Sequence, residues 1–198
     1  MIHIWPEINL LFIKVPGTGT SSFFHQLNTK YKFKPVDDPP VYDDIWKMND
    51  IKAGSHFTAI QIRKILSPDI WETYEKVAFI RNPYDWLNSI YNKPQGEKHY
   101  GIKTEGKKGK MSFGEFIRYV PKTPYFWITD SDGEVMIDTI YRTEDLDQIV
   151  FPKYGVLPTH LNTGFASPKK KRKFTQEDIG VIKKKFHREL EHYDVSLP

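Results

Sequence analysis

The sequence predicts an α/β protein, in which a mostly parallel sheet lies between layers of helices. Two segments carry this prediction, because each places a short, continuously apolar stretch directly before a polar turn and an amphipathic stretch. Continuous apolar runs are typical of strands that are buried on both faces, as parallel strands are. A chain of 198 residues has the usual size of one domain, so we expect a single three-layer domain over residues 1–198.

The first segment predicts a strand, an anion-binding loop and a helix. Residues 8–15 are apolar and β-prone, and the Gly, Thr and Ser residues that follow end this pattern. Gly17 and Gly19 allow the backbone to curl so that several N–H groups point at one ligand. One of the residues Thr20 to Ser22 is expected to cap the helix, whose first amides and dipole favour phosphate or sulfate. The alternative is an ordinary turn between a strand and a helix. The candidate anion loop comprises Pro16, Gly17, Thr18, Gly19, Thr20, Ser21 and Ser22.

The second segment, residues 76–92, repeats this arrangement. Its apolar run is followed by Pro83, which suits the first turn of a helix because its missing N–H is no loss there. Arg81 then stands at the carboxyl end of a strand, where open α/β sheets bind ligands. Ser89 follows about two helical turns later on the same side, so a guanidinium and a hydroxyl can share one phosphate. The alternative is a surface arginine and an unrelated helical serine.

The later elements follow from local patterns. Residues 112–119 predict a helix capped by Ser112, and residues 134–141 predict an alternating strand. Residues 143–150 predict a short helix with acids in its first turn, and Arg142 is expected to pair with Glu144 or with a ligand. A final helix is expected from Thr175 to about residue 193, with acids early and lysines late, as the helix dipole favours.

In their order, P-x-T-G-T-S-S (Pro16 to Ser22) and R-N-P-x-D-x-x-x-S (Arg81 to Ser89) resemble the paired signatures of sulfotransferases that use 3′-phosphoadenosine 5′-phosphosulfate (PAPS). In that superfamily the first loop holds the 5′-phosphosulfate, and the Arg and Ser of the second segment bind the 3′-phosphate. Residues 56–66, 132–146 and 157–162 resemble segments of the carbohydrate-type branch, in the same order. The resemblance leaves residues 25–50 and 93–111 unmatched.

The resemblance implies the P-loop NTPase-like sulfotransferase fold and transfer of a sulfuryl group from PAPS to a hydroxyl or amine, on a carbohydrate. The scheme requires no metal. Two other functions stay open. A nucleotide-dependent phosphotransferase would need a Walker-type lysine, and Thr20-Ser21 stand where G-K is expected. A non-catalytic PAPS, nucleotide or nucleic-acid binding protein would need no lysine in the loop.

One position departs from the family pattern. Members usually carry a Lys or Arg directly before the T-G of the first loop, where it stabilises charge on the leaving group, and this chain has Gly17 there. Lys14 is the candidate substitute, because it lies three residues upstream at the end of the strand. Its alternative role is that of a solvated strand-end lysine. A slow enzyme and a PAPS-binding protein without turnover also fit this departure.

His56 is the candidate general base, because the acceptor must lose a proton as it attacks and histidine titrates near neutrality. Related families place a catalytic histidine before the strand that ends in the 3′-phosphate arginine, which matches this position. The alternative is that Ser55 or His56 begins a helix, with the imidazole in solvent. The other histidines show no metal-ligand spacing.

The run of five cations at residues 169–173 is the strongest charge feature. It can be a solvated loop, a nucleic-acid or nuclear-localisation patch, or a clamp for an anionic ligand. In related sulfotransferases a basic loop near the C-terminus closes over the 3′-phosphate. By this resemblance Lys170 and Arg172 are the candidate cofactor-binding residues of the run.

Composition limits the remaining choices. The 29 basic and 25 acidic side chains give a net charge of +4, which is too small for a general polycation and makes nucleic acid an unlikely partner. The chain has no cysteine, which removes disulfides, thiol catalysis and Cys-based zinc sites. No segment has the pattern of a membrane anchor or a cleavable signal. We expect a soluble intracellular protein of a bacterial or viral type, with a nucleotide and a carbohydrate as its partners.

Overall fold

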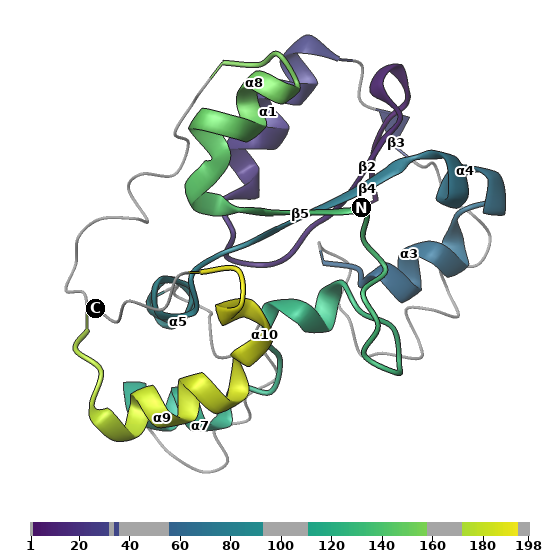
Figure 1. Cartoon of the computed structure of the whole chain (residues 1–198). Coiled ribbons are helices and arrows are strands. Elements are labelled where there is room, and N and C mark those ends of the chain that lie inside the picture. The colour runs from purple at the N-terminus through teal and green to yellow at the C-terminus, as the bar shows by residue number, and fades with distance from the viewer. Residues whose placement is uncertain (1, 32–33, 36–55, 93–110, 158–171, 194–198) are drawn as a thin grey trace. The chain divides into compact units, whose positions relative to one another are not determined.

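The computed structural model describes residues 2–31, 34–35, 56–92, 111–157 and 172–193, and its architecture is α/β (Figure 1). The chain divides into two compact units, and each is described by itself. The sheet unit is made of Met1–Ile80 and Pro124–His160. The helical unit is made of Arg81–Thr123 and Leu161–Pro198.

The sheet unit contains all the strands of the described residues, together with short and medium-length helices. In chain order its elements are β1 (His3–Trp5), η1 (Pro6–Ile8), β2 (Leu10–Ile13), α1 (Thr20–Lys30), β3 (Lys34–Pro35), α3 (Ala59–Ile65), α4 (Pro68–Thr73), β4 (Glu75–Ile80), η2 (Pro124–Trp127), β5 (Thr139–Arg142), η3 (Thr143–Asp145), η4 (Leu146–Val150) and α8 (Phe151–Lys153).

The five strands form one sheet in the order β3-β1-β2-β4-β5. β2 pairs in parallel with β4, and β4 in parallel with β5. This parallel half of the sheet agrees with the expectation from the two apolar segments, since parallel neighbours require a crossover such as the one that contains α1. β1 pairs antiparallel with both β2 and β3, and this antiparallel edge was not predicted.

Two predicted strand boundaries were wrong. The first apolar run does not become a strand until Leu10, because η1 occupies Pro6–Ile8 and Asn9 follows it in a left-handed conformation with φ 46°. The predicted strand over residues 134–141 starts only at Thr139. Val135 is 40% exposed and forms an isolated antiparallel bridge with Thr129, and Ile137 is buried but lies outside β5.

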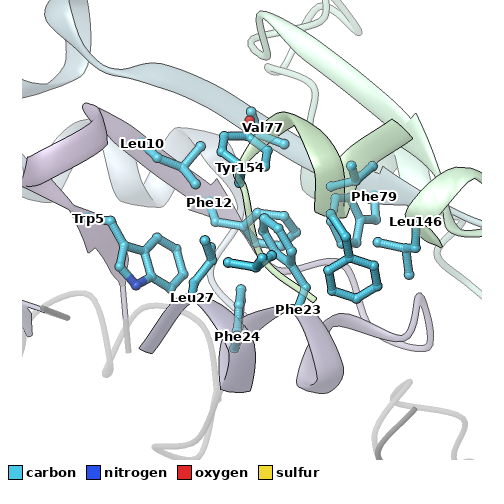
Figure 2. Close-up of a cluster of buried hydrophobic side chains, with 13 residues drawn as sticks. Trp5, Leu10, Phe12, Phe23, Phe24, Leu27, Val77, Phe79, Leu146 and Tyr154 are labelled. Atoms are coloured by element: carbon cyan, nitrogen blue, oxygen red, sulfur yellow. The ribbon is translucent and has the colours of Figure 1, made fainter. Parts of the chain in front are cut away.

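The two faces of the sheet are both buried. On one face, aromatic rings of β2, α1 and β4 meet in the core cluster of Figure 2, where the ring centroids of Phe23 lie 5.6 Å from Phe12 and 5.0 Å from Phe79. On the other face, Leu11, Ile13, Ala78 and Ile80 are fully buried. Aromatic pairs at these distances add to the hydrophobic term of burial, which is about 2–3 kcal/mol for each large side chain. The core therefore fixes β2 and the helix that follows the candidate loop.

The helical unit contains α5 (Pro83–Tyr91), α7 (Phe113–Tyr119), α9 (Gln176–Lys185) and α10 (His187–Leu190). α7 begins as predicted, with Ser112 as the N-cap in a capping box that Glu115 completes. α9 begins with the Thr175–Asp178 capping box, which confirms its predicted start. The prediction of one helix to about residue 193 was wrong, because the backbone leaves the helical conformation at Phe186, which is fully buried.

Candidate functional site

The loop between β2 and α1 has the curled backbone that its glycines predict. Gly17 and Gly19 have φ values of 81° and 73°, in the left-handed region that favours glycine. Between them Thr18 is fully buried, and its hydroxyl donates a hydrogen bond of 2.8 Å to the carbonyl oxygen of Val15. The loop is thus fixed from within by one short turn.

The N-cap of α1 is Gly19, which corrects the expectation that Thr20, Ser21 or Ser22 would cap this helix. Thr20 is already the first helical residue. The cap makes no side-chain hydrogen bond, and the first turn contains no acidic residue. By contrast α3, α7 and α9 each start with a capping box, and the Asn82 side chain accepts from the Tyr84 amide at the start of α5. The N-cap of α1 therefore supplies no side-chain acceptor, and the free amides and dipole of a helix start of this kind favour an anionic ligand.

His56 and Lys14 lie together at the carboxyl end of β2. The Nδ1 atom of His56 is 3.0 Å from the backbone oxygen of Lys14. Because a carbonyl oxygen only accepts, Nδ1 must carry the hydrogen and donate it, which leaves the lone pair of the neutral ring on Nε2. The alternative, in which Ser55 or His56 begins the helix, does not hold, since Thr58 caps α3 and His56 precedes this cap. The imidazole is thus held by the backbone of Lys14, the residue that follows β2, in the tautomer that a base acting through Nε2 requires.

The ammonium of Lys14 lies against α1, with Nζ 5.5 Å from the centroid of the Phe24 ring. Burial lowers the pKa of this lysine. No carboxylate among the residues that the structure describes forms an ion pair with it. Lys14 is therefore a half-buried cation beside the loop helix and not a fully solvated strand-end residue.

A second histidine joins this group. The ring of His3 packs 4.1 Å from that of Phe24, and it interacts electrostatically with Lys14 and His56. Burial, with a smaller contribution from Lys14, lowers the pKa of His3 to about 3, so this imidazole is neutral at pH values near 7. The sequence analysis did not place His3 beside Lys14 and His56, because β1 was not predicted.

Thr143 also contacts the loop and was predicted only as part of a helix start. Its hydroxyl makes no cap for η3 and instead points to the carbonyl oxygen of Thr18, at 3.0 Å. The neighbouring Arg142 forms a two-pronged ion pair with Asp145, at 2.7 Å for each prong. The sequence predicted that Arg142 would pair with Glu144 or with a ligand, and neither describes this ion pair. The tight turn of η3 instead brings Asp145 to the guanidinium.

In the helical unit, α5 begins at Pro83 as predicted, and Arg81 and Ser89 are both half-buried. Arg81 directly follows the last residue of β4. The predicted apolar face of α5 is also confirmed, with Trp86, Leu87 and Ile90 fully buried.

Arg172 is brought onto α5. Its backbone N–H donates to the side chain of Asn88, the neighbour of Ser89, at 3.2 Å. Its guanidinium carbon lies 4.6 Å from the ring centroid of Tyr91 and 5.8 Å from that of Phe113. Stacking of this kind fixes the plane of an arginine and leaves the N–H groups at its edge available for an anion. Lys170, the other candidate of the basic run, lies outside the described residues.

Comparison with known proteins gives no relative: no family model, curated protein or solved structure matches the chain. Among the described residues there is no cluster of His, Cys, Asp or Glu that could hold a metal ion. The described helices are all too short or too polar to cross a membrane.

Proposed function

We propose that the chain is a sulfotransferase that moves the sulfuryl group of PAPS to a hydroxyl or amine of an acceptor, on a carbohydrate. The observation that carries this proposal is the start of α1. A loop with two left-handed glycines leads into a helix whose N-terminus has neither a side-chain cap nor an acidic residue in its first turn. Such a terminus suits a phosphate or sulfate group.

The two anionic groups of the donor are assigned to different residues. We assign the 5′-phosphosulfate to the loop from Pro16 to Ser22. Following the resemblance of the sequence, we assign the 3′-phosphate to Arg81, Ser89 and Arg172, and Lys170 of the same basic run is a further candidate for it. The fork of an arginine matches phosphate oxygens in pairs, and this geometry distinguishes a 3′-phosphorylated nucleotide from one without that group.

In the proposed reaction, the oxygen or nitrogen of the acceptor attacks sulfur while the bond from sulfur to the bridging oxygen breaks, which releases adenosine 3′,5′-bisphosphate. Nε2 of His56 takes the proton of the acceptor. Nδ1 of the same ring stays bonded to the Lys14 carbonyl oxygen, so the ring keeps its orientation as it becomes charged. The Lys14 ammonium is the candidate to offset charge on the leaving oxygen, in the place of the usual loop cation.

A second function, PAPS binding without turnover, is favoured by Gly17. Its φ of 81° lies where a Lys or Arg is strained, so the loop conformation itself selects against the cation that related enzymes carry at this position. Lys14 decides between the two functions. If its ammonium cannot reach the leaving oxygen, the chain retains donor binding and lacks an important catalytic group.

The test is transfer of ³⁵S from labelled PAPS to a panel of glycans, with His56→Ala as the variant. We expect His56→Ala to lower turnover by about 10²–10⁴-fold and to leave the affinity for adenosine 3′,5′-bisphosphate nearly unchanged, since a base acts on the acceptor. His25→Ala is the matched control, because His25 is exposed on α1 and has no role in the scheme. Tight PAPS binding with no transfer to any acceptor would favour the non-catalytic function.

A further inference from the structure

Thr143 joins two segments of the sheet unit that are far apart in the sequence. Its Oγ1 atom lies 3.0 Å from the carbonyl oxygen of Thr18 in the loop and 2.9 Å from that of Ile80 at the end of β4. Carbonyl oxygens only accept, so the threonine hydroxyl is the donor to both, and its one hydrogen is shared between them. One side chain therefore ties the loop to the carboxyl end of the central strand pair.

The methyl group of the same side chain contacts the loop as well. A Cβ atom added to Gly19 would lie 3.3 Å from Cγ2 of Thr143. The hydroxyl thus contacts one end of the Thr18–Gly19 peptide and the methyl group packs against the other. Thr143 is itself fixed, because it follows β5 directly and stands inside the turn that the ion pair of Arg142 with Asp145 closes.

The hydrogen bond to Thr18 sets the direction of an amide. The peptide group is planar and trans, so the N–H of Gly19 points away from the carbonyl oxygen of Thr18. When Thr143 holds this oxygen, the N–H of Gly19 is aimed away from Thr143. Without the hydroxyl, this peptide plane can rotate, and glycine at position 19 offers little resistance.

We propose that Thr143 is a positioning residue of the donor site, which aims the Gly19 amide at the 5′-phosphosulfate; this inference rests on the proposed function. Thr143 touches no reacting atom and acts through the loop. The hydroxyl is the essential part, and the methyl group fills the space beside Gly19.

The experiment compares Thr143→Val, which keeps the shape and removes the donor, with Thr143→Ser, which keeps the donor and removes the methyl group. Thr139→Val is the matched control, because Thr139 begins β5, the strand that ends directly before Thr143, and its hydroxyl donates to Glu75 at 3.1 Å, in a bond of similar length. The dissociation constant for adenosine 3′,5′-bisphosphate is measured by calorimetry, at a temperature well below the melting point of every variant.

We expect Thr143→Val to weaken binding about tenfold or more, which is about 1.4 kcal/mol, while Thr143→Ser and Thr139→Val stay within about threefold of wild type. Thr143→Ala removes the same hydroxyl and replaces Thr143→Val if that variant does not fold. Equal affinity of wild type, Thr143→Val and Thr139→Val would overturn the inference alone. Wild type without measurable affinity would overturn the proposed function, and the inference with it.

Discussion

The left-handed conformation of Gly19 predicts both the direction and the size of the change in the free energy of unfolding when this residue is replaced by alanine. An alanine at this position must adopt φ 73°, and its Cβ atom must fit 3.3 Å from the Thr143 methyl group and 3.9 Å from Leu146. Gly180 is the matched control. It lies inside α9, is exposed to solvent and has nothing within 4 Å of an added Cβ.

The expected changes have opposite signs. At Gly19 the left-handed conformation costs alanine about 1–2 kcal/mol, and the tight contact with Thr143 adds about 1 kcal/mol. Alanine also lowers the entropy of the unfolded chain, which stabilises the folded protein by about 1 kcal/mol. The free energy of unfolding of Gly19→Ala should therefore fall by about 1–2 kcal/mol. Gly180→Ala should raise it by about 1 kcal/mol, because alanine is the better helix former.

The assay is urea unfolding of the wild type and the two alanine variants, followed by circular dichroism, with the affinity for adenosine 3′,5′-bisphosphate measured in parallel. We expect Gly19→Ala to be the less stable variant by about 2–3 kcal/mol. It should also bind the bisphosphate more weakly, since a shifted loop moves its amides away from the anion. If both substitutions stabilise the protein equally, Gly19 is not held in a left-handed conformation, and the described loop is wrong.

Local patterns in the sequence predicted the parts of the structure that depend on neighbours in the chain. The capping boxes at Ser112 and Thr175 gave the starts of α7 and α9, because the cap and its acceptor lie within one turn. The glycines of the loop were predicted for the same reason, since their conformational freedom is a property of the residue itself. The C-terminal break at Phe186 could not be read in this way, because the burial of that ring depends on tertiary packing.

The contacts of the candidate site were less predictable, because they join distant segments. Thr143 and Thr18 are 125 positions apart, and His56 and Lys14 are 42 apart. A threonine before two acids is also the pattern of a helix cap, so the local signal at Thr143 pointed to a different role. His3 could not be found without β1, whose three residues are too few to show an alternation.

Three further predictions test His3, Lys14 and Gly17. Because His3 has a folded pKa of about 3 against an ordinary 6.5, the unfolded chain binds the extra proton as the pH falls below 6.5, and stability is lost from there toward pH 3. Between about pH 7 and about pH 4.5 the free energy of unfolding should fall by at most about 3 kcal/mol from this cause. Urea unfolding at the two pH values should show this fall in His25→Phe and not in His3→Phe. Lys14→Ala should lower the rate of adenosine 3′,5′-bisphosphate release if this lysine offsets charge on the leaving group. Gly17→Lys should lower the free energy of unfolding by about 1–2 kcal/mol, because position 17 has a φ of 81°. The same variant should raise the rate of adenosine 3′,5′-bisphosphate release or leave it unchanged. If Gly17→Lys is active and the wild type is not, the chain is instead a binding protein that has lost turnover.

The most direct test of the central claim is the affinity of the wild type and Arg81→Ala for adenosine 3′,5′-bisphosphate, adenosine 5′-monophosphate, ATP and an oligonucleotide, at one stated salt concentration. We predict that the wild type binds the bisphosphate much more tightly than the other three, and that Arg81→Ala loses about 2–4 kcal/mol of this affinity and little of its weak affinity for the monophosphate. Preference for ATP would indicate a phosphotransferase, and preference for the oligonucleotide a nucleic-acid binding protein. Equal affinity for the bisphosphate and the monophosphate, in the wild type and the variant alike, would contradict the assignment of a PAPS site.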